Sequence, residues 1–379
     1  MSASVVVVGA GYAGVMAANR MKSRSEDTRV IVVNPRPVFV ERIRLHQLAT
    51  GSSDATVSFE QILHPGVELR VGTVERIDAR NGSIVLSDGE LLAYDHLIYA
   101  VGSTDRRDHI PGASEHAFSL SEFEQAHLLR LRLRALPRPL AVTVIGGGLT
   151  GIEAAAEFAE NDPELAVTLV SDSPVAQALP PRTRRKILDT LATLGVEVID
   201  GDRVAEIAEG KVTLADGRTL RSDCTVLATA FAVPDLARRS GLEVDADGRL
   251  LVDATLTSRS APAIVGAGDA VAGPADELGH LRMSCQTALP MGAHAADTVL
   301  ARLGGAEPTQ LSLGFVGQCI SLGRRRGAFQ PTHADDSPAW PAITGRVGAL
   351  VKEQVCLTTV RWMTKQATRG PYRWRRGPH

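Results

Sequence analysis

The sequence has 379 residues, of which 44% are hydrophobic, 22% charged and 4% aromatic, and its formal net charge is −2. These values are typical of a folded globular protein with two or three cores and exclude a disordered chain. The scarcity of aromatic residues argues against a stacking groove for nucleic acid, so we expect no nucleic-acid partner.

The charge is unevenly distributed along the chain. Residues 337–379 contain eight Lys or Arg and one acid, Glu353, which gives this stretch a net charge of +7. A basic tail on an acidic body suggests contact with an anionic surface such as lipid headgroups, and the alternative is a solvated, partly disordered end. No Lys or Arg precedes the apolar N-terminal run, which argues against a secretory signal. We expect a cytoplasmic protein, either free or peripheral on the inner face of the cell membrane.

The first apolar run leads into a glycine-rich turn. Val5–Val8 is expected to form a buried strand and Ala13–Met21 the following helix, and Gly9, Gly11 and Gly14 between them meet the spacing GxGxxG. Such glycines permit a tight turn, let a pyrophosphate approach the backbone and let the helix pack closely on the strand. The context of strand, turn and helix predicts a dinucleotide site.

The next strand is expected at Val30–Val33, and Asn34 follows it. An acid usually stands there and hydrogen-bonds the adenosine ribose. Asparagine can still donate to and accept from a pair of hydroxyls, although it lacks the charge. We therefore expect Asn34 to contact the ribose, and the alternative is a turn that no longer binds a nucleotide.

An internal repeat follows the first unit. "GVELRVGTVERIDARNGSIVLSDG" begins at Gly66, and the similar "GVEVIDGDRVAEIAEGKVTLADG" begins at Gly195. Each copy predicts a pair of strands, with a hairpin signal at Asp88-Gly89 or Asp216-Gly217, and each leads into another apolar strand. Two homologous nucleotide-binding units are the simplest explanation.

The second unit has its own glycine turn. Gly146, Gly148 and Gly151 repeat the GxGxxG spacing after the strand "VTVI", and Ser171 occupies the position where the ribose acid is usually found. A 2′-phosphate requires a nearby arginine, and the first one after Ser171 is Arg182. This pattern favours NADH, with NADPH as the alternative.

Two dinucleotide-binding turns in one chain suggest a resident flavin and an exchangeable nicotinamide, between which a hydride can pass. The predicted fold class is α/β, with two Rossmann-like units and a small C-terminal segment. We assign residues 1–108 and 234–306 to an FAD-binding unit, 109–233 to an NAD(P)H-binding unit, and 307–379 to the C-terminal segment with its basic tail.

Several stretches resemble the two-dinucleotide-binding flavoprotein oxidoreductases, and within them the type II NADH dehydrogenases and the apoptosis-inducing-factor-like NADH oxidoreductases. The similar stretches are 38–51, "YDHLIYAVGS" (94–103), "GGGLTGIEAAAEFAE" (146–160), 255–271 and "FVGQCISLGRRRGAF" (315–329). The resemblance implies that Glu153 lies near the nicotinamide and the flavin, and that Asp269 contacts the ribityl–phosphate part of FAD. We expect Glu153 and Gln286 to act in catalysis. The expected cofactor contacts are Gly9, Gly11, Tyr12, Ala13, Gly14, Asn34, Pro35, Arg36, Arg42, Val74, Ala100, Gly102, Gly146, Gly148, Leu149, Thr150, Gly151, Ser171, Gly268, Asp269, Gln286, Thr287 and Ala288.

The chain also departs from this family. In "SCQTALPMG" (284–292), Gln286 and Ala288 fit the family's Ala-Gln-x-Ala-x-Gln pattern, but Cys285 and Pro290 replace an alanine and a glutamine. These glutamines flank the quinone in the family, so another acceptor stays open. No cysteine precedes Cys224, which excludes the disulfide reductases of the superfamily that relay electrons through an early cysteine pair. Beyond Phe329 we expect no long amphipathic helix.

The prediction is an FAD-dependent NAD(P)H oxidoreductase that passes hydride from NADH to the flavin and electrons on to a quinone. One alternative is a reductase whose acceptor is a small redox protein or a pathway substrate. Another is a flavoprotein that senses NADH, with incidental turnover. We expect no metal site, and leave open both a homodimer and a redox role for Cys285.

Overall fold

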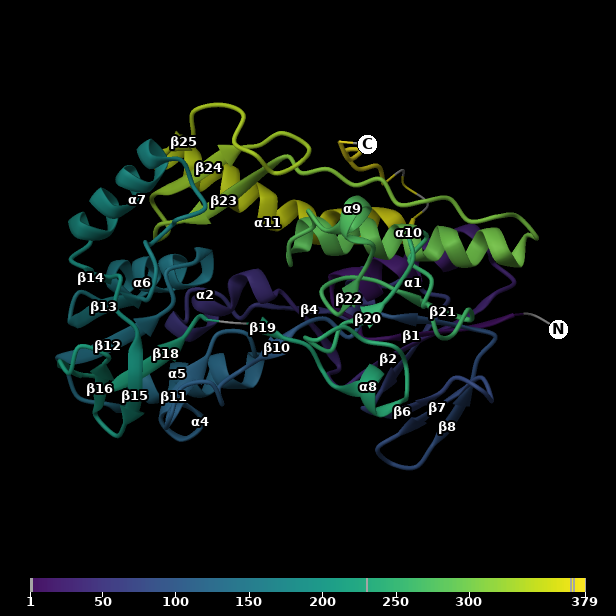
Figure 1. The fold of residues 1–379 in the computed structure, drawn as a ribbon, viewed down its shortest axis with the longest axis horizontal. Helices are drawn as coiled ribbons and strands as arrows, with labels where there is room; N and C mark the ends of the chain where they lie inside the picture. The colour runs from purple at the N-terminus through teal and green to yellow at the C-terminus, as the bar shows by residue number, and fades with distance from the viewer. Residues whose placement is uncertain (1–2, 230, 369, 371, 379) are drawn as a thin grey trace.

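The computed structural model describes residues 3–229, 231–368, 370 and 372–378. Figure 1 shows two lobes, each built around its own sheet, and a long C-terminal helix that lies across both. The predicted α/β class is confirmed, because each lobe contains a five-stranded parallel sheet covered by helices. The residue limits assigned to the two units remain predictions.

The first sheet has the strand order β21–β9–β1–β2–β5, which is the order of a doubly wound dinucleotide-binding sheet. Its strands are β1 (Ser4–Val8), β2 (Arg29–Asn34), β5 (Val67–Val71), β9 (His96–Tyr99) and β21 (Ile264–Gly266). Strand β21 comes from far along the chain, so the polypeptide returns to this sheet after it has formed the second lobe. The predicted strands at Val5–Val8 and Val30–Val33 are the cores of β1 and β2.

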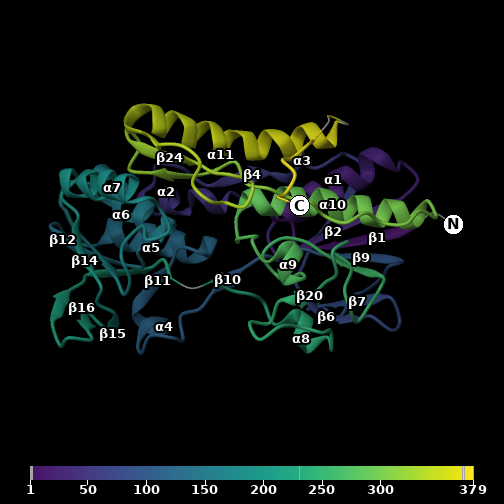
Figure 2. The same cartoon turned by 45° about the horizontal axis from the view of Figure 1, so that its top comes forward.

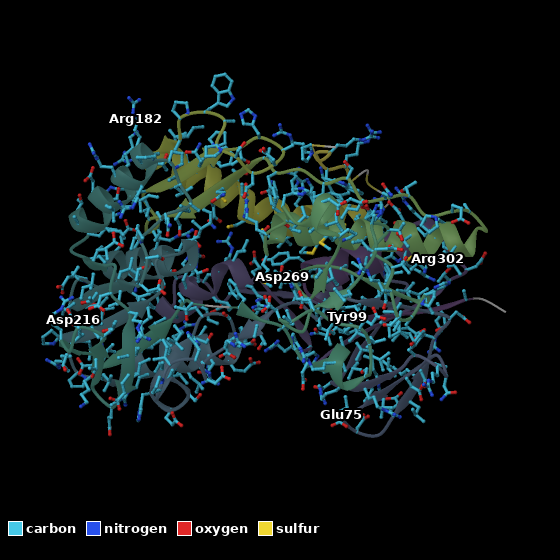
Figure 3. All side chains as sticks on the ribbon, in the orientation of Figure 1. Glu75, Tyr99, Arg182, Asp216, Asp269 and Arg302 are labelled. Atoms are coloured by element: carbon cyan, nitrogen blue, oxygen red, sulfur yellow. The ribbon has the colours of Figure 1, made fainter. Side chains whose placement is uncertain are left out.

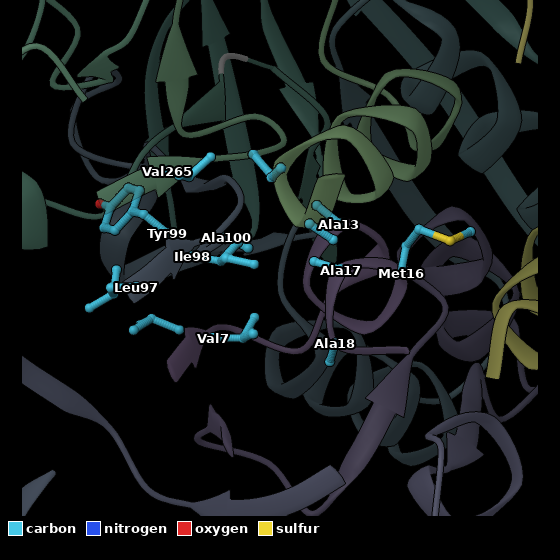
Figure 4. Packing of buried hydrophobic residues seen from close by; sticks show 14 of the residues in the cluster. Val7, Ala13, Met16, Ala17, Ala18, Leu97, Ile98, Tyr99, Ala100 and Val265 are labelled. Atoms are coloured by element: carbon cyan, nitrogen blue, oxygen red, sulfur yellow. The ribbon is translucent and has the colours of Figure 1, made fainter. Parts of the chain in front are cut away.

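Helix α1 (Tyr12–Arg24) packs on this sheet through small residues. Figure 4 shows Ala17 of α1 on the side of Val7 of β1 and Ile98 of β9, and Ala13 next to the green helix α10. All of these side chains are buried. Because alanine has so short a side chain, the helix can lie close to the strands, which brings its N-terminus to their carboxyl ends. On its other side α1 packs against α10 (Cys285–Leu303).

The second sheet repeats the design, with the order β11–β18–β12–β13–β14. Its strands are β11 (Ala117–Ser119), β12 (Leu140–Ile145), β13 (Leu165–Ser171), β14 (Glu197–Asp200) and β18 (Cys224–Leu227). Helices α5 (Phe123–Ala135), α6 (Leu149–Asn161) and α7 (Pro181–Thr193) bury their apolar faces in the same core as this sheet. The short helix α2 (Leu45–Thr50) comes from the first lobe and joins this core.

The internal repeat forms two three-stranded antiparallel sheets, as the paired hairpin signals predict. One contains β6 (Val74–Asp78), β7 (Ser83–Leu86) and β8 (Leu91–Ala93), and the other contains β15 (Val204–Ala208), β16 (Lys211–Leu214) and β17 (Thr219–Arg221). Both carry an irregularity at the same place, after Val74 and after Val204. The lobes are joined by β10 (Thr104–Asp105), which pairs with β19 (Phe231–Ala232).

The remaining elements are short. They are β3 (Val38–Val40), a 3₁₀ turn at Arg42–Arg44, β4 (Thr56–Ser58), α3 (Phe59–Ile62), α4 (Ala113–His116), α8 (Leu236–Arg239), β20 (Leu250–Leu251), β22 (Val271–Ala272), α9 (Ala275–Leu278), β23 (Gly317–Ser321), β24 (Gly327–Pro331) and β25 (Ile343–Thr344). Strands β23, β24 and β25 form a small antiparallel sheet under the C-terminal helix.

Beyond Phe329, where no long amphipathic helix was expected, a long helix is present. Helix α11 covers Gly345–Ala367, and its buried face is formed by Gly348, Lys352, Cys356, Thr359 and Met363. Several of these are polar, while large apolar residues are exposed on the opposite face, so the usual amphipathic pattern is inverted. The end of the chain is not solvated throughout either, because Trp374 donates a hydrogen bond to the Ser312 carbonyl and packs against His294. Arg369 of the predicted basic tail lies outside the described residues.

Candidate functional site

The first glycine turn joins β1 to α1 and lines the principal cavity. Gly9 has a φ of +97°, which glycine adopts without strain, and a Cβ at Gly14 would lie 1.8 Å from the Gly9 carbonyl oxygen. A Cβ at Gly11, in contrast, would meet no described atom within 4 Å. Gly11 therefore leaves open space at the N-terminus of α1, as a bound phosphate requires.

A cavity of about 300 Å³ extends along the carboxyl ends of the first sheet. Most of the predicted flavin contacts line it, namely Gly9, Gly11, Tyr12, Ala13, Asn34, Pro35, Arg36, Arg42, Ala100, Gly102, Gly268, Asp269 and Ala288. Val74 does not line it, because its side chain is buried in the core beside β7. Gly14 and Thr287 lie behind the lining; Thr287 donates its hydroxyl to the Arg282 carbonyl.

The cavity offers polar groups that suit FAD. Asp269 accepts a hydrogen bond from the Ser103 hydroxyl at 2.8 Å through Oδ2, whereas its buried Oδ1 has no partner within the described chain. Arg42 donates to the Ser103 carbonyl at 2.5 Å and so fixes this wall. Asp269 lies in the middle of the molecule, between the lobes (Figure 3). A buried carboxylate oxygen without a partner is costly, and a hydroxyl-bearing ligand such as the ribityl chain would satisfy it.

Sequence reasoning missed several residues of this cavity. Ser103, Thr104, Ser121, Glu122 and Phe123 line it, yet they lie in or beyond the link between the lobes. No spacing rule connects them to the glycine turn, because they reach the cavity where the chain crosses to the second lobe at β10 and where α5 begins.

The second glycine turn has the same construction. Gly146 has a φ of +124°, and a Cβ at Gly151 would lie 1.8 Å from the Gly146 carbonyl oxygen. Helix α6 then begins with Leu149 and Thr150, and a Cβ at Gly148 would meet no described atom within 4 Å. The turn therefore also leaves room for a phosphate at a helix N-terminus.

Ser171 ends β13, where it is buried and donates its hydroxyl to the Ser173 carbonyl at 2.6 Å. The following Asp172 is exposed. Arg184, two residues beyond Arg182, binds the Val175 carbonyl and Asp200.

A buried ionic cluster lies where the two lobes and α11 meet. Glu153 of α6 forms an ion pair with Lys352 of α11, with 2.8 Å between Oε1 and Nζ. The same carboxylate oxygen accepts a hydrogen bond from the Ser321 N–H of β23, also at 2.8 Å. His46 of α2 contacts the Ser321 hydroxyl at 3.4 Å. Residues of α2, α6, β23 and α11, which are distant in sequence, therefore meet around one carboxylate, which is the acid expected beside the nicotinamide.

Burial and charge together set the protonation of this cluster. Burial alone would raise the pKa of Glu153, but Lys352 and His46 hold that pKa below its usual range. Burial alone would lower the pKa of Lys352, and Glu153 instead raises it. Burial lowers the pKa of His46 to about 4. At neutral pH the cluster is therefore a carboxylate, an ammonium group and a neutral imidazole.

A second ion pair fixes α11 beside the first. Arg44 binds Glu353 with 2.7 Å between Nη2 and Oε1, and Arg324 binds the other oxygen of Glu353 at 2.9 Å. The hydrogen bond from Arg44 is the largest contribution that lowers the pKa of Glu353, which falls to about 2. Lys352 and Glu353 are thus both anchored, and neither was singled out as a site residue from the sequence.

Three of the four cysteines surround Lys352, although they come from α10, β23 and α11. Burial raises the pKa of Cys285 to about 11 and that of Cys356 to about 12, and it also raises the pKa of Cys319. All three cysteines are free. At neutral pH they are protonated thiols, which are poor nucleophiles.

Gln286 stands in the first turn of α10, after the cap residue Ser284. With its amide oriented so that both atoms have partners, Gln286 donates to the Gly317 carbonyl at 3.0 Å and accepts from the Val316 N–H at 2.9 Å. It therefore joins α10 to the start of β23 and does not line the principal cavity.

Comparison with known proteins gives a consistent set of relatives. The family described as pyridine nucleotide-disulphide oxidoreductase matches residues 3–296. An NADH dehydrogenase-like protein of Mycobacterium tuberculosis is 32% identical over 320 residues, which cover 78% of this chain and 80% of the relative. Human ferroptosis suppressor protein 1 is 29% identical over 63% of this chain and 65% of its own.

Solved structures share the fold at lower identity. The sulfide:quinone oxidoreductase of Aquifex aeolicus has a TM-score of 0.81 at 18% identity, and the match covers 96% of this chain and 92% of that one. The NDH2 of Plasmodium falciparum, solved in complex with NADH, has a TM-score of 0.81 at 14% identity and is matched over 97% of both chains. At such identities the likeness establishes the fold alone.

Proposed function

Because this chain belongs to the pyridine nucleotide-disulphide oxidoreductase family and is an FAD-dependent pyridine nucleotide oxidoreductase, we propose that it carries electrons from NADH to a quinone. FAD, when bound, supplies the chemistry that takes up a hydride and passes its electrons on. The observation that supports this best is the pair of equivalent glycine turns, with Glu153 buried one helical turn after the second.

The residues around the first turn would hold FAD. Gly11, Tyr12 and Ala13 would offer backbone N–H groups to the pyrophosphate, since the N–H groups of Gly9 and Ala10 are already bound by the Val33 carbonyl and by Asn34. The unpartnered Oδ1 of Asp269 would accept from the ribityl hydroxyls. Gly148, Leu149 and Thr150 would offer the same to the nicotinamide dinucleotide, since the Gly146 N–H is already bound by the Val170 carbonyl. Glu153 and Lys352 form a net-neutral buried ion pair, which fixes α6 and α11 beside the second glycine turn.

The surroundings of Ser171 favour NADH over NADPH. Arg184 is already engaged by Asp200, and an exposed carboxylate at Asp172 disfavours an added phosphate. Asp172 can instead accept hydrogen bonds from the ribose hydroxyls of NADH.

The first experiment separates the two half-reactions. The purified holoprotein is mixed anaerobically with NADH or NADPH while the flavin absorbance is followed, and a short-chain quinone is then added. We expect rapid bleaching by NADH, slower bleaching by NADPH and recovery with quinone. Bleaching without recovery would indicate that the acceptor is not a quinone but a small redox protein or a pathway substrate. No bleaching by either nucleotide would overturn the oxidoreductase cycle in favour of an NADH sensor.

We further propose that the protein acts at an anionic lipid surface, where a lipid-soluble quinone resides. The outer face of α11 exposes Val347, Leu350 and Leu357, at 57%, 65% and 50%, in one helical stripe. The exposed basic residues Arg346, Arg361 and Lys365 lie on the same helix. Both views of the ribbon show α11 on the outside of the molecule (Figures 1 and 2).

Charge complementarity selects the lipid surface as the occupant of this face. The acid of α11, Glu353, is already neutralised by Arg44 and Arg324, so the outer face presents apolar and basic groups together. This combination is typical of helices that lie in a membrane interface. None of the described helices is long and apolar enough to cross a membrane.

Flotation with vesicles tests this second proposal. Binding is measured with neutral phosphatidylcholine vesicles and with vesicles that also contain anionic phosphatidylglycerol. We expect binding to the anionic vesicles alone, and its loss in Leu350→Glu. The matched control is Leu131→Glu, which changes another exposed leucine, on α5 and away from α11. Absence of binding, together with a dimer that Leu350→Glu dissociates, would assign the face to a second copy of the chain.

A further inference from the structure

We infer that Glu122, at the start of α5, is the carboxylate that recognises the adenosine ribose of the FAD bound at the first glycine turn. The inference rests on the proposal that FAD occupies this cavity, and it assigns a specific residue to FAD binding. It also gives the first dinucleotide site an acid in place of the one that is missing after β2.

Asn34 stands where that acid is expected, but its amide is already engaged by the backbone. Its Oδ1 accepts a hydrogen bond from the Ala10 N–H at 3.0 Å, and its Nδ2 donates to the Arg36 carbonyl at 2.8 Å. These bonds tie the end of β2 to the glycine turn. Asn34 therefore positions the backbone that lines the cavity. Any further hydrogen bond from Asn34 to a ribose would come from a neutral amide and would lack the strength of a bond to a carboxylate.

Glu122 supplies a carboxylate at the same end of the cavity. It lines the cavity together with Arg36, Thr104 and Phe123. Its Oε1 accepts from the Thr104 hydroxyl at 2.8 Å, and its Oε2 accepts from Arg36 at 3.3 Å. Since Arg36 follows the end of β2 by two residues, Glu122 lies on the side of the cavity where a doubly wound fold places the adenosine ribose.

The carboxylate of Glu122 keeps acceptor capacity for a ligand. Glu122 occupies the cap position of α5, yet within the described chain its side chain makes no capping hydrogen bond. A carboxylate has about four acceptor sites, and the Thr104 and Arg36 bonds use two of them. Two lone pairs are therefore left for the adjacent hydroxyls of a ribose.

The neighbouring Glu124 explains why Arg36 does not neutralise Glu122. Arg36 binds Glu124 through two parallel bonds of 2.7 Å and 2.6 Å, which are shorter than its contact with Glu122. Glu124 does not line the cavity, and its side chain is 57% exposed. Glu124 thus takes up most of the Arg36 charge and leaves Glu122 available to a ligand.

This arrangement makes FAD a link between the lobes. Helix α5 buries Ala126, Leu129 and Leu133 in the core of the second sheet, whereas the glycine turn belongs to the first. A ribose held by Glu122 would connect the two. Binding of FAD should therefore depend on a residue outside the first sheet.

The test measures binding and does not require turnover. Apoprotein of wild type, Glu122→Gln, Glu115→Gln and Asn34→Ala is titrated with FAD by flavin fluorescence, with ADP as a competitor and with FMN. We expect Glu122→Gln to weaken FAD and ADP by about tenfold, since it removes a charged acceptor, and to leave FMN unchanged because FMN has no adenosine. Glu115→Gln, which changes an exposed acid of α4 outside the cavity, should bind all three like the wild type.

Thermal unfolding of each apoprotein separates lost recognition from lost folding. The inference is overturned if Glu122→Gln binds FAD like the wild type, if it weakens FMN as much as FAD, or if only Asn34→Ala loses ADP. Wild-type protein that takes up no FAD overturns it as well. Wild-type protein that binds FAD but is not reduced by NADH defeats the proposed reaction and leaves this inference intact.

Discussion

The ammonium group of Lys352 lies 2.8 Å from the carboxylate of Glu153, although 199 residues separate them and both side chains are about nine-tenths buried. Through this ion pair the C-terminal helix reaches the helix of the second glycine turn. Further along, the same helix contacts α1, where the Met363 carbonyl accepts a hydrogen bond from Asn19 at 2.9 Å. Helix α11 therefore contacts both dinucleotide-binding helices.

A buried ion pair loses most when one partner is removed, because the other charge is left uncompensated. We expect Lys352→Met and Glu153→Gln each to lower the free energy of unfolding, Lys352→Met by about 3–5 kcal/mol. The double variant should recover most of this loss, since it leaves no unpaired charge. Chemical denaturation of the three variants measures the effect.

The exposed pair Arg239–Asp235 is the control, and Arg239→Met should cost under about 1 kcal/mol. Additive losses in the double variant would contradict the coupling.

His46 should make stability depend on pH. Its pKa is about 4 in the folded protein against 6.5 when unperturbed, because burial disfavours the charged ring; Glu153 opposes this shift, and Lys352, Arg324 and Arg44 reinforce it. Between these values the unfolded chain binds more protons, so the free energy of unfolding rises with pH. The stabilisation is complete above about pH 6.5 and is lost towards pH 4, by about 3 kcal/mol at most.

Thermal midpoints of wild type and His46→Gln between pH 7.5 and 4.5 test this expectation. The wild-type midpoint should fall more steeply on acidification, and the variant should fall less because its side chain does not titrate. Glu153, whose lowered pKa also favours stability at higher pH, contributes to both proteins in the same direction. Parallel curves would show that His46 does not bind a proton on unfolding in this range.

The parts of the fold that follow local rules were predictable from the sequence. The strands around each glycine turn and the hairpins of the repeat lie where the apolar runs and Asp-Gly signals predict them, because backbone geometry at these places depends on near neighbours. The match to residues 3–296 confirms the resemblance to flavoprotein oxidoreductases that these motifs carry. Most of the predicted flavin contacts also line one cavity, although their contact with FAD remains a prediction.

The parts that depend on long-range packing were not predictable. Helix α11 turns Lys352 and Thr359 inward and Leu350 and Leu357 outward, so its hydrophobic pattern does not identify the buried face. Lys352 is buried in an ion pair with Glu153, which is far away in sequence and compensates its charge. Glu122 escaped notice for a similar reason, since the acid of the first unit was sought at the end of β2 and not beyond the link to the second lobe.

The first glycine turn predicts opposite effects for two substitutions of the same kind. Gly14→Ala would place a Cβ 1.8 Å from the Gly9 carbonyl, so we expect it to destabilise even the apoprotein by about 1–3 kcal/mol. In Gly11→Ala the added Cβ would have no described atom within 4 Å, so the apoprotein should be as stable as wild type. The methyl group would, however, occupy the space that the phosphate of FAD requires. We expect FAD affinity to fall at least about tenfold in Gly11→Ala. Apoprotein melting and FAD titration measure the two effects, and an apoprotein of Gly11→Ala that melts early would contradict this division.

The last prediction concerns the acceptor side of the reaction. Because both amide atoms of Gln286 bind the backbone of Val316 and Gly317, Gln286→Ala frees the start of β23 from α10. We expect reoxidation of the flavin by quinone to slow about tenfold, as the loss of such hydrogen bonds would produce, while reduction by NADH stays unchanged.

Gln318→Ala is the control, since Gln318 lies on β23 as well but binds Asp336. Stopped-flow traces of the two half-reactions distinguish the outcomes. If reduction by NADH slowed equally, Gln286 would support the nicotinamide side as well, and the two sides of the flavin would not be separated at this residue.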